Sequence, residues 1–276
     1  MNVNDAPLPG GARLAPVLRL RDGLCSNEMD WLTEEVPVAL EFNGISHAVM
    51  LATPMDLEDF ALGFSLSEGL LDHASDLYDC EVLACAEGLT VSMEVSSRCF
   101  ARLKQRRRTL AGRTGCGICG TECLEQVLRL APRVRPGPPI RSTAVARAMH
   151  GMRERQVLGQ ATGATHAAAW CGPAGEVRLV REDVGRHNAL DKLIGALARA
   201  GIEAHGGFIA ITSRASVEMV QKAAVAGVPL LAAVSAPTQL AAQTAHHAGM
   251  CLAGLARQGN LVVYAHPQHM VLDTKD

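Results

Sequence analysis

The sequence has few aromatic residues and little net charge. Phe, Trp and Tyr make up 3% of the 276 residues, and the formal net charge is -2 at pH 7. A chain so close to charge balance produces no overall field that would attract nucleic acid or anionic lipid. We therefore expect no nucleic-acid partner, and any anion site must be a local feature.

Long apolar runs are also missing. The longest one, Ala223 to Ala236, is too short to span a bilayer and is interrupted by Gly227 and Pro229. Residues 1–16 contain no basic cluster followed by an apolar segment, which a signal peptide requires. We expect no membrane span, a flexible N-terminal tail over 1–16, and a cytoplasmic protein.

The nine cysteines are an odd number, which does not suit a framework of disulfides. A chain of 276 residues buries a sufficient core without disulfides or a structural metal. In a reducing compartment, closely spaced cysteines are more often catalytic, redox-active or metal-binding than structural. The spacing of the cysteines must decide between these roles.

The first half of the sequence predicts an α+β lobe. Asn43 and Gly44 separate two strand-like segments, Glu35 to Phe42 and Ser46 to Leu51, and form a strong hairpin signal. Thr53 and Pro54 then suggest the start of a helix, with Thr53 as its N-cap. A second predicted hairpin pairs 81–84 with 89–95.

From Gly207 onward, strand-like and helix-like segments alternate. This predicts an α/β fold with a largely parallel sheet. The segments are strands 208–212, 230–234, 251–255 and 261–264, with helices 216–226 and 238–247 between them. A proline-rich connection at 136–139 suggests a boundary between a lobe over 17–135, ending in a mobile CxxC loop and its following helix, and a cofactor-binding α/β lobe over 136–276.

The sharpest chemical motif is Cys116-Gly-Ile-Cys119. Arg113 precedes it and a helix is expected to begin near Thr121, and both features stabilise a thiolate. Cys123 adds a third sulfur, so a zinc or iron-sulfur site is an alternative, although the chain offers no second well-spaced ligand pair. The motif alone leaves thiol chemistry, metal binding and coincidence open.

A zinc deaminase is a further possibility, because those enzymes combine Pro-Cys-x-x-Cys with a separate His-x-Glu. In this sequence Gly115 replaces the proline, and Ala168 stands where His166 would require the catalytic glutamate two positions later. Deamination is therefore disfavoured.

A second polar segment runs from Arg181 to Lys192, just before a helix with an apolar face. Helix capping by Asn188 and a first-turn position for Asp191 would explain two of its residues without any ligand. Arg186 and His187 are not explained by capping.

Two predicted strand ends form the third feature. The loops 212–216 and 235–238 open into helices at the carboxyl edge of the sheet, where open α/β sheets bind phosphates. Serine and threonine are also common caps, so ordinary capping remains an alternative. The two adjacent loops together with Arg214 favour a nucleotide.

Taken together, these segments resemble the family of formate dehydrogenase accessory sulfurtransferases, the FdhD family. The resemblance lies in residues 35–71, Thr114 to Gly120, Arg181 to Gly195, Ser213 to Lys222, Val234 to Thr238 and His266 to Gln268. It implies a protein that takes sulfur from a cysteine desulfurase as a persulfide. The sulfur then passes to the molybdenum or tungsten of a bis(molybdopterin guanine dinucleotide) cofactor, which formate dehydrogenase requires.

The resemblance also implies site residues. Cys116 would carry the persulfide and Cys119 would assist by exchange or by resolving it. The cofactor-binding stretch of the family falls on Leu255, Ala256, Arg257, Gln258, Gly259 and Asn260, to which we add Ser213, Arg214 and Ser235 from the strand ends. Here Leu255 replaces an aromatic residue that is common in the family, and Ala164 replaces a glycine.

The fold implied by the resemblance is a three-layer α/β/α core similar to that of cytidine deaminase, with a smaller N-terminal α+β lobe. The implied partners are a cysteine desulfurase, formate dehydrogenase and a second copy in a homodimer, and no resident metal is expected. Two alternatives remain, a non-catalytic chaperone that shelters the cofactor and a thiol-disulfide oxidoreductase.

Overall fold

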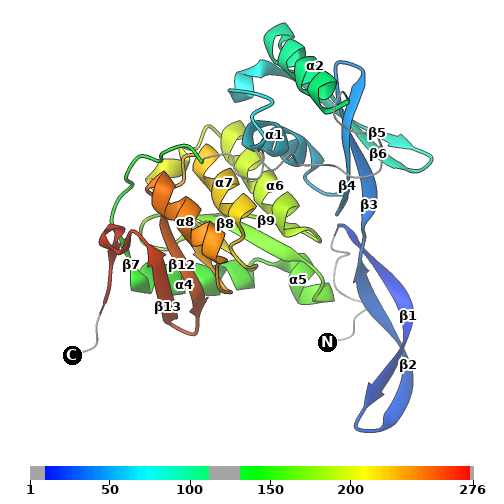
Figure 1. The fold of residues 1–276 in the computed structure, drawn as a ribbon. Helices are drawn as coiled ribbons and strands as arrows, with labels where there is room; N and C mark the ends of the chain where they lie inside the picture. Colours follow the sequence, from blue (N-terminus) through cyan, green and yellow to red (C-terminus); the bar gives the residue numbers. More distant parts are fainter. Residues whose placement is uncertain (1–9, 112–130, 274–276) are drawn as a thin grey trace.

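A six-stranded sheet is the centre of the C-terminal part of the molecule (Figure 1). The computed structural model describes residues 10–111 and 131–273. The strand order is β13-β12-β11-β10-β8-β9. The strands are β8 (His166–Cys171), β9 (Val177–Asp183), β10 (Phe208–Ile211), β11 (Leu230–Ala233), β12 (Cys251–Arg257) and β13 (Asn260–Ala265).

The sheet is mixed, which corrects the expectation of a largely parallel one. β10, β11 and β12 are parallel to one another, whereas β8, β9 and β13 pair antiparallel with their neighbours. The alternation after Gly207 correctly indicated the parallel strands, because each crossover contains a helix. β8 and β9 lie earlier in the chain and join the sheet as an antiparallel pair.

Helices cover both faces of this sheet, so the expected three-layer α/β/α core is confirmed. Along β10, Ile209 and Ile211 face one apolar cluster and Phe208 and Ala210 face the other. The first cluster contains residues of α6 (Arg186–Arg199), α7 (Val217–Val225) and α8 (Gln239–Ala248). The second contains residues of α4 (Ser142–Glu154), which is followed by the short α5 (Val157–Thr162).

The N-terminal lobe is built on a four-stranded sheet in the order β4-β3-β6-β5. Its elements are β3 (Val36–Phe42), β4 (Ile45–Ala52), α1 (Leu57–Ser67), β5 (Leu77–Cys85), β6 (Gly88–Val95) and α2 (Ser97–Ala111). Both predicted hairpins are present. Asn43 and Gly44 adopt φ values of 47° and 77°, which explains why this pair forms the turn.

The predicted start of α1 was wrong. The helix begins at Leu57, after Asp56 in a left-handed conformation, and not at Pro54. Thr53 is completely buried and contacts the other lobe, where its amide donates to Asp183 and its hydroxyl oxygen accepts from the Val184 amide. Thr53 therefore joins the two lobes and does not cap a helix.

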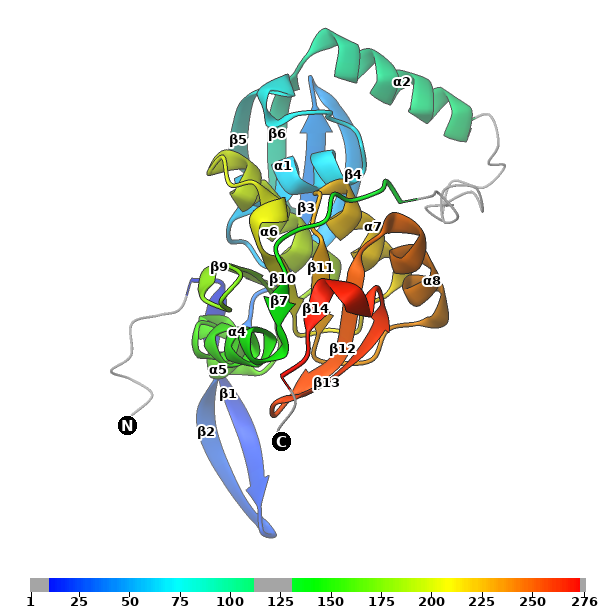
Figure 2. The ribbon, with the colours of Figure 1, turned by 90° about the vertical axis from the view of Figure 1, so that its left-hand side faces the viewer.

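A two-stranded ribbon, β1 (Ala12–Arg21) and β2 (Leu24–Thr33), projects from the body (Figure 2). β1 begins within the segment that we expected to be a tail. Shorter elements complete the described chain, namely β7 (Ile140–Arg141), β14 (Met270–Val271) and 3-10 turns at 74–76, 204–206 and 267–269. In the described part, no helix is both long enough and apolar enough to cross a membrane.

The two lobes meet where α1 crosses α6. A Cβ on Gly63 would lie 1.7 Å from the carbonyl oxygen of Asp191, and a Cβ on Gly195 would lie 1.9 Å from that of Asp59. These distances leave no room for any side chain, so glycine at both positions permits the helices to touch through their backbones. Buried ion pairs surround this contact, with Lys222 lying 3.0 Å from Asp191.

We predict that Gly195→Ala destabilises the protein despite the higher helix propensity of alanine. The added methyl group meets backbone, which cannot move aside, so the free energy of unfolding should fall by about 1–3 kcal/mol. Gly206→Ala is the matched control, since a Cβ there has nothing within 4 Å. Urea unfolding of both variants provides the measurement, and equal stability of the two would contradict the steric account.

Candidate functional site

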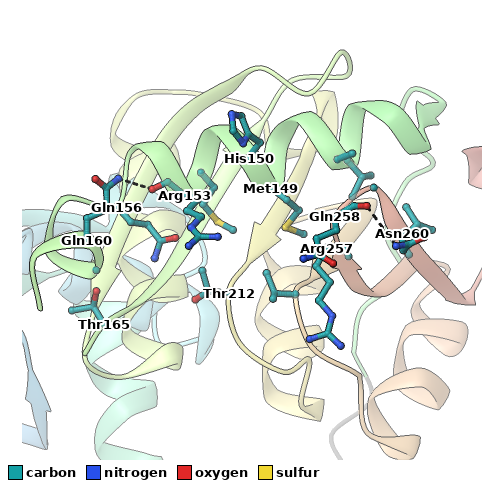
Figure 3. Close-up of a pocket in the computed structure, with 18 of the residues that line it drawn as sticks. Met149, His150, Arg153, Gln156, Gln160, Thr165, Thr212, Arg257, Gln258 and Asn260 are labelled. Carbon is teal, nitrogen blue, oxygen red and sulfur yellow. Dashed lines mark hydrogen bonds between the residues drawn. The ribbon is translucent and has the colours of Figure 1, made fainter. Parts of the chain in front are cut away.

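A cavity of about 1090 Å³ lies at the carboxyl edge of the central sheet. One wall comes from α4 and α5, the other from the turn between β12 and β13, and the ends of β10 and β11 lie between them. Figure 3 shows Arg153 extending from the helical wall and Arg257 from the opposite one. The carboxyl edge is the place where open α/β sheets bind their ligands.

The wall from β12 and β13 is bent by an unusual backbone. Leu255 has a φ of 52° in the middle of β12, where the pairing with β13 shifts register between Gly254 and Arg257. Gln258 and Gly259 then form a turn with φ values of 53° and 79°. A positive φ at leucine is costly, and such residues concentrate at functional sites. The bulge and turn direct the stretch that follows Leu255 into the cavity.

Most of the family's predicted cofactor-binding stretch lines this cavity. Ala256, Arg257, Gln258, Gly259 and Asn260 belong to its lining, whereas Leu255 does not. Leu255 instead donates its amide to the carbonyl oxygen of Ser235 at 3.3 Å. Its role in the structure is to anchor the bulge.

The three strand-end residues lie at the same edge but outside the lining. Arg214 is exposed, and the Ser213 hydroxyl donates to its carbonyl oxygen. Their neighbours Thr212 and Val234 line the cavity instead. All of these residues follow the last residue of β10 or β11, so the loop backbone and not a strand determines which side chains enter the cavity.

The lining contains no aspartate or glutamate. Its charged or titratable members are His150, Arg153 and Arg257. Among the described residues, neither arginine forms an ion pair. Two guanidinium groups without carboxylate partners, facing one open cavity, create a local positive potential that favours an anionic ligand.

Amide side chains, with the hydroxyl groups of Thr165 and Thr212, supply the remaining polar groups of the lining. Gln156 and Gln160 come from the helical wall, and Gln258 and Asn260 from the opposite turn (Figure 3). Gln160 donates to the carbonyl oxygens of Arg153 and Glu154, at 2.7 and 3.0 Å, which ties α5 to the end of α4. Such amides both donate and accept hydrogen bonds, as recognition of a heterocyclic base requires.

Glu182 is close to the cavity but faces the other way. It accepts hydrogen bonds from the amides of Leu158 and Gly159 and from the hydroxyl of Thr165. The carboxylate therefore holds the first turn of α5, where its charge also suits the helix dipole. Its negative charge is used in this way and does not compete with a bound anion.

The predicted catalytic residues Cys116 and Cys119 lie outside the described residues and remain predictions. Among the described cysteines, burial raises the pKa of Cys80 to about 11 and those of Cys171 and Cys251 to about 12. Thiols with such pKa values are protonated at neutral pH and are poor nucleophiles. These three cysteines are therefore unsuited to sulfur exchange.

The segment from Arg181 to Lys192 forms the junction between the lobes, and our capping interpretation was wrong. Gly185 precedes α6 without a side-chain cap. Asn188 lies within the helix and donates to Leu51 and Asp183, while Asp191 is fully buried. Lys192 is also fully buried, and its ammonium lies 2.7 Å from Asp183.

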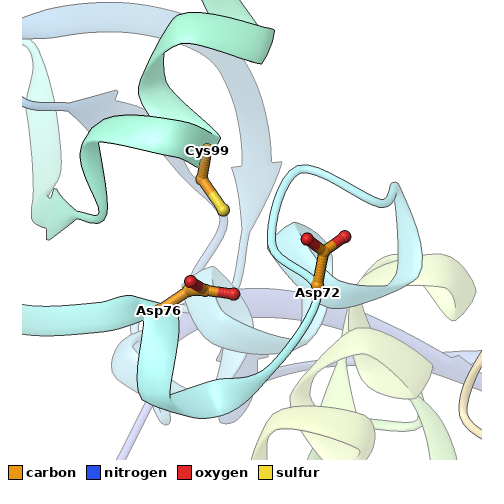
Figure 4. Close-up of side chains that lie close together, drawn as sticks. All are labelled: Asp72, Asp76 and Cys99. Carbon is orange, nitrogen blue, oxygen red and sulfur yellow. The ribbon is translucent and has the colours of Figure 1, made fainter.

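One group of possible metal ligands was found in the described part of the chain, namely Asp72, Asp76 and Cys99 (Figure 4). Both carboxylates already face arginines. Arg98 lies 3.1 Å from Asp72 and 3.3 Å from Asp76, and Arg102 lies 2.9 Å from Asp72. A hydrogen bond from the Ser96 hydroxyl, together with Arg98, lowers the pKa of Asp76 to about 2. Ion pairing explains the group without a metal.

The helical wall of the cavity was not identified from the sequence. Met149, Arg153, Gln156 and Gln160 lie on α4 and α5, in a segment whose pattern is that of any amphipathic surface helix. The excess of methionine and amide side chains in this segment is too weak a signal to predict a ligand site. Only the packing of these helices beside the β12–β13 turn reveals their role.

The sequence of this chain is similar to those of several known proteins. A protein from Variovorax paradoxus named sulfur carrier protein FdhD is 59% identical over 97% of this chain and 96% of its own. Proteins of the same name from Bordetella petrii and Cupriavidus necator are 54% and 57% identical over 94% and 96% of this chain, and over 94% and 92% of their own lengths.

A crystal structure of a candidate formate dehydrogenase accessory protein from Desulfotalea psychrophila has the same fold. Its TM-score is 0.74 at 21% identity, covering 94% of this chain and 99% of the other. The model of the FdhD/NarQ family matches residues 33–271. With a family match over most of its length and relatives more than half identical, this chain belongs to the FdhD/NarQ family.

Proposed function

We propose that this protein is a sulfur carrier for formate dehydrogenase. It receives sulfur from a cysteine desulfurase and delivers it to the molybdenum or tungsten of a bis(molybdopterin guanine dinucleotide) cofactor, which is its bound substrate. The names of the similar proteins support sulfur transfer. We further propose that it acts in the cytoplasm as a homodimer.

The observation that carries the proposal is the acid-free cavity with Arg153 and Arg257 on opposite walls. A guanine dinucleotide presents a pyrophosphate to guanidinium groups and a base edge rich in donors and acceptors to amides. The cavity offers both kinds of group, with the amides Gln156, Gln160, Gln258 and Asn260. Its volume reaches the upper end of ordinary ligand sites, about 300–1000 Å³.

The two cysteines of the motif are sufficient for both steps of sulfur transfer. The Cys116 thiolate attacks the terminal sulfur of the donor's persulfide, which forms a Cys116 persulfide and releases the donor's thiolate. The Cys119 thiolate then attacks the Cys116 sulfur atom. A Cys116–Cys119 disulfide forms and hydrosulfide leaves to become the metal ligand, so Cys119 supplies the electrons. A cellular thiol reduces the disulfide afterwards.

We predict that Cys116 carries the sulfur. Incubation with a cysteine desulfurase and cysteine should add one sulfur atom, about 32 Da, to the wild-type protein. Intact-protein mass spectrometry should show no such addition to Cys116→Ala. Cys25→Ala is the control, because Cys25 is an exposed cysteine on β2 and should not affect loading.

Loading of Cys116→Ala to the wild-type level would contradict the persulfide assignment. An unmodified Cys116→Ala that still supports formate dehydrogenase activity would favour the cofactor chaperone. Reduction of generic disulfides without any sulfur loading would favour a thiol-disulfide oxidoreductase.

We also predict that the arginines of the cavity bind a guanine nucleotide. Arg257→Ala and Arg153→Ala should each weaken GDP binding about tenfold, because each removes a charged hydrogen-bond donor worth about 1.5 kcal/mol. Arg147→Ala is the control on the same helix, since Arg147 is exposed and outside the lining. Isothermal titration calorimetry gives the affinities, and an unchanged affinity in both cavity variants would overturn the assignment of this cavity.

A further inference from the structure

A second polar cluster lies at the carboxyl edge, on the opposite face of the sheet from the cavity. His166 begins β8 and pairs with Asp183 at the end of β9, which brings the start of α6 beside it. Arg186 and His187 form the first turn of that helix, and Glu218 lies in the first turn of α7. His166 shares a face with Ala168, which packs in the core under α6 and α7.

The carboxylates in this region are already paired. Glu218 accepts a hydrogen bond from the Ser216 hydroxyl at 2.8 Å and lies 3.3 Å from Nε2 of His187. Asp183 is fully buried, pairs with Lys192 and accepts from the Gly185 amide. Neither carboxylate is available to another cation.

Arg186 is thereby left without a counter-ion. Among the described residues its guanidinium forms no ion pair, and its Nε is buried without a hydrogen-bond acceptor. The residue as a whole is half-buried. A buried donor without an acceptor costs about 1–3 kcal/mol, and more when it is charged. Such an arrangement is stable when a bound anion supplies the acceptor.

The two histidines add neutral hydrogen-bonding groups. Burial, and then the charge of Arg186, lower the pKa of both His166 and His187. Lys222 acts in the same direction on His187, whereas Asp183 raises the pKa of His166 and Glu218 raises that of His187. Both imidazoles are therefore neutral near pH 7, and the guanidinium is the charge that an anion would meet.

The cluster adjoins the cavity at Thr212. The Thr212 hydroxyl lies 3.5 Å from Nδ1 of His166, and Thr212 also lines the cavity. One ligand that reaches over the end of β10 would therefore contact both places. A small anion would occupy the cluster alone.

We propose that Arg186 and His166, next to His187, bind a tetrahedral oxyanion at the carboxyl edge of the sheet. The oxyanion is either free or the phosphate group of a nucleotide that extends from the cavity. Arg186 supplies the charge and its buried Nε–H, and the neutral His166 supplies one N–H, whereas Nε2 of His187 faces Glu218. The site is defined by its own residues and does not depend on the sulfur-transfer function.

Crystals soaked in tungstate test the site directly. We expect an anomalous peak within hydrogen-bond distance of the Arg186 guanidinium in the wild-type protein and no peak in Arg186→Gln. Arg178→Gln is the control, because Arg178 is exposed and paired with Glu176, and its crystals should keep the peak. A second soak with GDP distinguishes a nucleotide phosphate from a free oxyanion. A GDP phosphate beside Arg186 would identify a nucleotide as the ligand, and its absence there would identify a free oxyanion.

A measurement in solution keeps the proposal testable if Arg186→Gln fails to fold. An oxyanion beside the imidazoles favours their protonated forms, so tungstate should raise the pKa of His166 and His187 in NMR titrations of the wild-type protein. The exposed His247, which lies outside both the cavity lining and the cluster, serves as the internal control. No peak at Arg186 with either soak, or unchanged pKa values of both histidines in tungstate, would overturn the proposal.

Discussion

The contact between α1 and α6 holds the functional edge of this protein in place. Gly63 and Gly195 allow the two backbones to touch, and no larger residue fits at either position. The N-terminal lobe thereby reaches the region where β9 ends and α6 begins. There, Lys192 of α6 donates to the carbonyl oxygen of Thr53 at 3.0 Å. The position of the carboxyl edge relative to the N-terminal lobe depends on this contact.

Buried charges make the junction specific. Asp59 lies 2.7 Å from Arg181 and 2.9 Å from Arg199, and Lys222 joins Asp191 and Glu68. Removing Lys222 would leave the fully buried Asp191 without its ammonium partner, which costs about 3–5 kcal/mol. Burial raises the pKa of Asp191. Burial alone would lower the pKa of Lys222, but the carboxylates of Asp191 and Glu68 together raise it. These residues therefore stabilise the junction between the lobes.

The sequence predicted those features whose causes are local. The turn at Asn43 and Gly44 requires positive φ at both positions, and few other residue pairs adopt it readily. The parallel strands β10, β11 and β12 followed from alternating apolar segments. Asn188, Asp191 and Thr53 were misinterpreted because each has a partner more than 120 residues away in the chain, and no local pattern predicts such contacts.

Only part of the candidate site was predictable from the sequence, because its other residues follow no distinctive local pattern. The stretch from Ala256 to Asn260 was found through its resemblance to a family, whereas Arg153, Gln156 and Gln160 belong to an ordinary amphipathic pattern. The loop backbone that follows β10 and β11 then determines which neighbouring residues enter the cavity. Thr212 and Val234 do so, and Ser213 and Ser235 do not.

Transfer of radioactive sulfur tests the central claim most directly. The protein is loaded with labelled sulfur from a cysteine desulfurase, isolated, and mixed with formate dehydrogenase that lacks the sulfur ligand. The account predicts that label moves to the molybdenum cofactor as formate oxidation appears, and that excess GDP slows both. Formate oxidation that appears while the label stays on this protein would contradict it.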